Sequence, residues 1–188
     1  IYVPIKAADL LRRIGQDTAL LQSAMRRAFP DINGTVAYWP CEDGANANSL
    51  ASALGGPAMS ISGSPTMAGF TGYAGSDAIP TVNNSRWSGV VPNYTGTGVI
   101  EVRFLVAIPG TLTVGATLMK LTCTGTAPTW VVNYAAGGDV IVKAFDRAGA
   151  TLLTSATADF NMDGKNGYFR FKVEQNGVTL FFTSATLS

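Results

Sequence analysis

The chain opens with apolar positions at helical spacing. Over residues 7–29, apolar or small side chains recur in a heptad pattern, which predicts one long helix. The larger apolar residues of its seam are Leu11, Ile14, Leu21 and Met25. The pairs Arg12-Arg13 and Arg26-Arg27 fall on the outer face. Phe29-Pro30 ends the helix, because proline disfavours helical geometry in the residue before it.

Two roles fit this helix. It can pack on its own domain through the wide apolar stripe, or it can join copies of the chain in a coiled coil, for which a trimer is favoured. Thr18 and Ala28 in the seam make the coiled coil a weak one. We assign residues 1–34 to this helix and a linker, as an oligomerisation or docking element.

After residue 30 the periodicity changes to short runs with β-strand alternation, separated by turn residues. The predicted strands are Thr35–Trp39, Asp77–Pro80, Val99–Ile108, Thr117–Thr124, Thr129–Tyr134, Asp139–Phe145, Thr151–Thr154, Tyr168–Glu174 and Val178–Ser184. Residues 42–70 are rich in Gly, Ala, Ser and Pro and are predicted to form a long loop.

The clearest strand, Val99–Ile108, places Ile100, Val102, Phe104 and Val106 on one face. Hairpin turns are predicted at 135–139, at 146–149 and, most strongly, at Gln175-Asn-Gly177. Neighbouring strands joined by tight turns, with no helix between them, indicate a mainly β fold. We therefore expect an antiparallel jelly-roll β-sandwich over residues 35–188, preceded by the single N-terminal helix.

Composition narrows the function classes. Hydrophobic residues make up 47% of the 188 residues and charged residues only 13%, about half the roughly 25% of an average soluble domain. Such a chain is not disordered. A net charge of +1 gives no field to attract nucleic acid. No apolar run is long enough for a transmembrane helix, so membrane insertion is not expected.

The sequence contains no histidine, which rules out the usual His-dependent nucleophile systems. No carboxylate pair has the spacing of a glycosidase strand, and no phosphate-binding loop or dinucleotide motif is present. We therefore predict no catalytic residues, no cofactor and no enzyme. The two cysteines, Cys41 and Cys123, are interpreted as partly buried thiols, with a disulfide as the alternative.

Two acidic segments have a structural and a metal-binding interpretation. Glu42-Asp43-Gly44 is typical of a solvated turn, although the two acids could also bind calcium or form a carboxylate dyad. Asp159 and Asp163 flank a loop that lacks the downstream Glu of a calcium-binding EF-hand. The turn is the simpler interpretation in both places, so no metal site is predicted.

Aromatic residues are the candidates for carbohydrate binding, since exposed rings stack on sugar faces. The candidates are Trp87, Trp130 and Tyr134, with Asn93, Tyr94 and Asn133 as further aromatic and polar groups. Trp130 and Tyr134 are evenly spaced on one strand and share a face. If that face is the outer one, they form a sugar platform; if it is the inner one, they belong to the core.

The segment Ala37-Tyr-Trp-Pro-Cys-Glu-Asp-Gly44 carries a family resemblance. A strand ending in Tyr-Trp-Pro and followed by Glu-Asp-Gly resembles the opening of concanavalin A-like, laminin-G-like jelly-roll domains. These are the domains found in minor tail proteins of phages that infect actinobacteria. Ala51–Met59, Gly63-Ser-Pro65 and Asp77–Pro80 continue the pattern. The resemblance covers residues 35–184, and its motifs are most specific in residues 37–65.

The resemblance implies a structural minor tail protein, located at the tail tip or fibre of a virion. Its implied partners are other tail subunits, further copies of the chain and a glycan of the host cell surface. The alternative is a bacterial or phage carbohydrate-binding module that recognises cell-wall glycan. Because this domain type has further strands, we expect the sandwich of residues 35–188 to be incomplete at its C-terminal end.

Overall fold

A computed structural model describes residues 22–82, 84–157, 163–174 and 178–186. The chain divides into two compact units, one up to Tyr94 (unit 1) and one from Thr95 onward (unit 2), and each is described by itself. The boundary at residue 94 falls inside the segment predicted as one sandwich. The predicted division at residue 34 stays a prediction.

The described part of the N-terminal helix is short. Helix α2 spans Ala24–Ala28 and continues into a 3-10 turn, η1, at Phe29–Asp31. The backbone N–H of Arg26 donates to the Ser23 hydroxyl at 3.0 Å, so Ser23 caps the helix. Pro30 is tolerated because the first turn of a helix needs no N–H from it. Leu11, Ile14 and Leu21 of the predicted seam lie outside the described residues, and Met25 is half-buried in α2.

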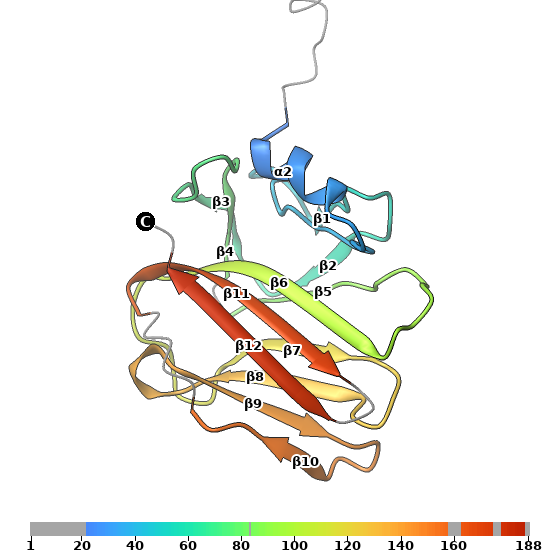
Figure 1. The fold of residues 1–188 in the computed structure, drawn as a ribbon. Coiled ribbons are helices and arrows are strands. Elements are labelled where there is room, and N and C mark those ends of the chain that lie inside the picture. The colour runs from blue at the N-terminus through green and yellow to red at the C-terminus, as the bar shows by residue number, and fades with distance from the viewer. Residues whose placement is uncertain (1–21, 83, 158–162, 175–177, 187–188) are drawn as a thin grey trace, which may run out of the picture. The chain divides into compact units, whose positions relative to one another are not determined.

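Unit 1 contains two small antiparallel sheets (Figure 1). Strands β1 (Ser49–Leu50), β2 (Met59–Ser62) and β5 (Arg86–Ser88) are ordered β1-β2-β5. Strands β3 (Thr66–Phe70) and β4 (Ile79–Thr81) form a pair. The prediction of a strand at Asp77–Pro80 corresponds to β4.

Two sequence expectations for unit 1 are wrong. Residues 42–70 are not one loop, since they contain β1, β2 and β3. These strands are short and built largely from Ser, Met, Ala and Gly, which give little β-strand signal. Thr35–Trp39 lies in no sheet. Its aromatic side chains make tertiary contacts instead, and the one backbone–backbone bond to a distant segment runs from Ala53 N–H to the Tyr38 carbonyl.

Unit 2 contains the longer strands. One sheet is ordered β12-β11-β6, with β6 at Val99–Ile108, β11 at Lys165–Glu174 and β12 at Thr179–Thr186. The other is the meander β10-β9-β8-β7, with β7 at Thr117–Thr122, β8 at Thr129–Tyr134, β9 at Val140–Phe145 and β10 at Thr151–Thr154. Every pairing within these sheets is antiparallel.

The two sheets of unit 2 share one hydrophobic core. Trp130 of β8 and Phe171 of β11 meet edge to face at 5.9 Å between ring centroids, and both are fully buried. Ile100, Val102, Phe104 and Val106 were predicted to share one face of β6, and all four pack against this core. The mainly β, antiparallel class is thus confirmed; the jelly-roll connectivity stays a prediction.

The predicted turns of unit 2 are built by local polar contacts. Asp146 accepts a bond from Ala150 N–H through Oδ1 at 2.8 Å, and Gly149 adopts a φ of 85° that favours glycine. Residues 136–138 form a 3-10 turn between β8 and β9. The Asn-Gly turn at 175–177 lies outside the described residues, but Glu174 pairs with Thr179 as a hairpin requires.

Candidate functional site

The segment that carries the family resemblance forms a set of tertiary contacts in unit 1. The Tyr38 ring packs on Phe29 with centroids 5.3 Å apart. The indole N–H of Trp39 donates to the Pro57 carbonyl at 2.9 Å. Pro40, which precedes the acidic pair in the sequence by two residues, is buried. The motif therefore connects η1 to the β1–β2 region.

Glu42 is the polar centre of this arrangement. The Ser23 hydroxyl lies 2.8 Å from both carboxylate oxygens, and the Ser76 hydroxyl donates to Oε1 at 2.7 Å. The backbone N–H of Asp77 donates to the same oxygen at 3.1 Å. One carboxylate thus joins the helix cap to the loop before β4. Met25 N–H adds a backbone bond to the Gly75 carbonyl at 2.9 Å. We call Glu42 with Ser23, Ser76 and Asp77 the Glu42 clamp.

Asp43 points to a different partner. Its Oδ1 accepts from Ala51 N–H at 3.0 Å, while its Oδ2 is buried with no hydrogen-bond partner. The chain turn comes after this pair, where Ala47 N–H bonds to the Gly44 carbonyl. The expectation of a solvated turn at Glu42-Asp43 is therefore wrong, because both carboxylates serve tertiary contacts. Within the described residues, no group of three or more His, Cys, Asp or Glu is placed to hold a metal ion.

Cys41 and Tyr38 are made weaker acids by their surroundings. Burial raises the pKa of the Cys41 thiol to about 12, with further increases from Asp43 and then Glu42. Burial also raises the pKa of Tyr38 to about 12, followed by Glu42 and Cys41, with Arg26 acting in the opposite direction. At neutral pH Cys41 is thus a neutral thiol, and a neutral thiol is a poor nucleophile. Neither cysteine, Cys41 or Cys123, forms a disulfide.

Two of the three aromatic candidates for sugar binding lie in the core of unit 2. Trp130 is 0% exposed and Tyr134 is 1% exposed. The Tyr134 hydroxyl donates to the Asp163 carboxylate at 2.8 and 2.9 Å. A ring buried on both faces has no surface for a sugar to stack on, so the platform interpretation of these two residues is corrected to a core role.

Trp87 is the remaining candidate, and it belongs to the other unit. It lies on β5, opposite Ile61 of β2, and is half-buried. Its indole nitrogen is buried and has no hydrogen-bond partner. Among the further candidates, Tyr94 is 45% exposed. The side-chain amide of Asn133 donates hydrogen bonds to the Gly115 carbonyl and the Thr117 hydroxyl. Trp87 therefore belongs to unit 1, whereas Trp130 and Tyr134 belong to the core of unit 2.

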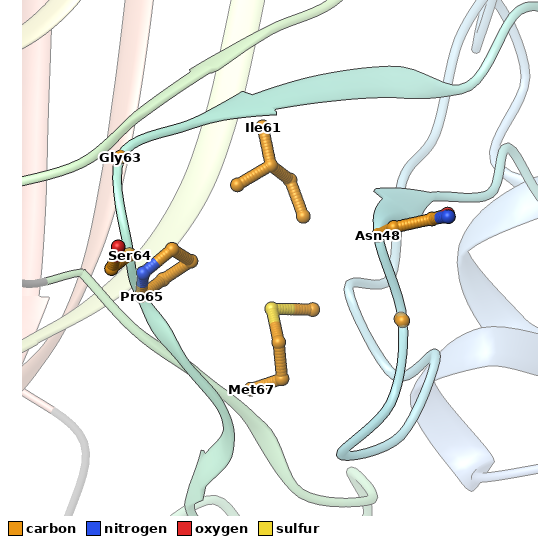
Figure 2. Close-up of a pocket in the computed structure, with 7 residues that line it drawn as sticks. Asn48, Ile61, Gly63, Ser64, Pro65 and Met67 are labelled. Carbon is orange, nitrogen blue, oxygen red and sulfur yellow. The ribbon is translucent and has the colours of Figure 1, made fainter.

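Unit 1 also has a shallow groove of about 340 Å³, which the sequence did not predict. Figure 2 shows the side chains of Ile61 and Met67 extending into it, while the Asn48 amide points away. The lining residues are Ala47, Asn48, Ile61, Gly63, Ser64, Pro65 and Met67. The groove is wide open to solvent, so it would enclose little of a bound ligand. It was missed because its walls lie in the segment predicted as loop.

A second polar cluster lies on the three-stranded sheet of unit 2. Glu101 pairs with Arg103 at 2.5 Å on β6 and with Arg170 at 2.8 Å on β11. The hydrogen bond from Arg170 is the main reason that the pKa of Glu101 is lowered, and Arg103 adds to the effect. Lys172 and Glu174 form a longer pair at 3.7 Å. Glu101 and Arg103 lie on the face of β6 that points away from the core, as the alternation of side chains along a strand predicts.

Comparisons with known proteins add no relative, since no family model, no curated protein and no solved structure matches the chain. Within the described residues, no helix is long and apolar enough to cross a membrane.

Proposed function

We propose that the chain is a structural minor tail protein of a bacteriophage, with a lectin-like jelly-roll domain that serves assembly and host-surface attachment. It acts in the virion, next to other tail subunits and further copies of itself. The proposal rests on the Tyr-Trp-Pro…Glu-Asp-Gly resemblance. It is supported by the antiparallel sheets that occupy the region of that resemblance.

The observation that carries the proposal is the role of the motif in unit 1. Three polar side chains of the motif form hydrogen bonds to residues outside it. Trp39 bonds to Pro57, Glu42 holds Ser23 and Ser76, and Asp43 holds Ala51. A motif used in this way favours a scaffold over a reaction centre. The neutral, buried Cys41 thiol supports the same interpretation.

The experiment that tests this function asks whether the protein belongs to a particle. An antibody raised against the chain is used to probe density-gradient fractions from a lysate of the source culture. We expect the chain to sediment with tailed particles and the antibody to block their adsorption to host cells. Recovery of the chain only as a free protein, with normal adsorption in the presence of antibody, would contradict the proposal.

A carbohydrate-binding module is the second candidate, and Trp87 is the observation that favours it. Of the three predicted aromatics, Trp87 is the one not enclosed in a core. Titration with cell-wall polysaccharide should then show binding that Trp87→Ala weakens at least tenfold, a typical loss for one stacking aromatic.

The control for that titration is Leu152→Ala, which removes an exposed apolar side chain from β10 of unit 2. Equal losses in both variants would point to nonspecific apolar contact. No binding by the wild-type chain would remove this candidate.

A further inference from the structure

Among the described residues, strand β6 lies at the edge of its sheet. The order β12-β11-β6 places β11 on one side of β6 and no described strand on the other. With ten residues, β6 is as long as β11, and neither glycine nor proline interrupts it. An edge strand directs half of its backbone N–H and C=O groups away from its neighbour, which makes a long, regular edge a template for another strand.

The side chains of β6 specify what kind of strand would fit. Its outer face carries Glu101 and Arg103, which have opposite charge and lie two positions apart. If two copies of β6 lie antiparallel with Val102 opposite Val102, then Glu101 of each copy lies opposite Arg103 of the other. Opposite charges placed directly across an antiparallel pair stabilise it, and like charges destabilise it.

The same register also matches the apolar positions. On the core side, Ile100 of each copy lies opposite Phe104 of the other, and both residues already pack against the core of their own unit 2. On the outer side, Val99 lies opposite Leu105. A shift by one residue would place the core face of one copy beside the outer face of the other, which the pleat opposes. The charge pattern therefore selects one register.

We propose that β6 is a homotypic docking edge that pairs with β6 of a second copy about a twofold axis at Val102. The product is a continuous sheet ordered β12-β11-β6-β6-β11-β12 across the two copies. Such an isologous contact closes after two copies and leaves no further β6 edge exposed. It uses strand pairing alone, so it requires neither the N-terminal helix nor the tail function proposed above.

Charge reversal provides the test. In Glu101→Arg both charges of the edge become positive, and in Arg103→Glu both become negative. Each variant should lose self-association, with the dimer dissociation constant rising on the order of 30-fold, since two cross-strand pairs change from attractive to repulsive. An equimolar mixture of the two variants should form a heterodimer, because every charge then faces its opposite. The double variant, Glu101→Arg with Arg103→Glu, should self-associate again.

The assay is sedimentation velocity of the full chain, combined with capture of an untagged variant by a tagged one. Lys120→Glu on β7 is the control, because it makes the same change of charge as Arg103→Glu at an exposed site on the other sheet. Melting temperatures show that each variant folds. A monomeric wild type, self-association that neither reversal weakens, or a mixture that fails to restore it would each overturn the proposal.

Discussion

Replacing Glu42 tests whether the motif of residues 37–44 is a structural element. In Glu42→Ala the hydroxyls of Ser23 and Ser76 lose their shared acceptor, and so does the backbone N–H of Asp77. A hydrogen bond to a charged group contributes about 1.5–3 kcal/mol. Because Glu42 is half-buried and the freed serines can turn to water, the contributions do not add fully. We expect unit 1 to lose about 2–4 kcal/mol.

Glu42→Gln separates charge from shape. It keeps one carbonyl oxygen for Ser76 and Asp77, so the expected loss is about 1 kcal/mol, typical of exchanging a charge-assisted bond for a neutral one. Ser76→Ala should cost less in the Glu42→Ala background than in the wild type, by about 1 kcal/mol of coupling. Asp31→Ala, which removes an exposed carboxylate from the same unit, should change stability by less than about 0.5 kcal/mol.

The measurement is urea unfolding combined with hydrogen exchange read by mass spectrometry. Peptides that contain Met25 and Asp77 should exchange on the order of 100-fold faster in Glu42→Ala, as a loss of about 3 kcal/mol requires. The reasoning would be refuted if the variant kept wild-type stability. It would also be refuted if millimolar calcium raised the melting temperature of the wild type but not of Glu42→Gln, because Glu42 would then be a metal ligand.

Three further predictions follow from single residues. Trp130→Ala should destabilise unit 2 by about 4 kcal/mol in thermal unfolding, the typical cost of deleting a fully buried large ring. The Cys41 thiol should resist iodoacetamide at neutral pH until the chain is unfolded. Because folding raises the pKa of this thiol from 9.0 to about 12, its contribution to stability is present below pH 9 and is lost as the pH rises towards 12. Gly63→Ala should cost about 2 kcal/mol more than Gly115→Ala, because both glycines have positive φ but only at Gly63 would a Cβ meet backbone, 2.8 Å from the Asn84 carbonyl oxygen.

The strands of unit 2 could be predicted because their residues favour them locally. Val99–Ile108 alternates apolar and charged residues over 100–104 and is rich in β-branched residues, and the structure has β6 at the same bounds. Thr129–Tyr134 is likewise identical to β8. The shared face of Trp130 and Tyr134 followed from the two-residue period, but sequence alone left open whether that face was inner or outer. Burial decides that it is inner.

Unit 1 could not be predicted in the same way, because its order depends on contacts between distant residues. Glu42 bonds to Ser76, which lies 34 residues further along the sequence, and no local sequence pattern predicts such a bond. Strands as short as β1, with two residues, carry no period to detect. The strand expected at Thr35–Trp39 had the right composition, but its backbone forms only one backbone bond to a distant segment, from Ala53 N–H, and no sheet pairing. The solvated turn expected at Glu42-Asp43 was wrong for the same reason, because both carboxylates form hydrogen bonds to residues distant in the sequence.

The proposed tail function is tested most directly by imaging. Gold-labelled antibody against the chain is applied to particles purified from the source culture and viewed by electron microscopy. The account predicts gold at the tail, concentrated at its tip or fibres, with label lost when the antibody is first absorbed with the purified chain. Label on no particle, while the chain is abundant in the soluble fraction, would contradict it.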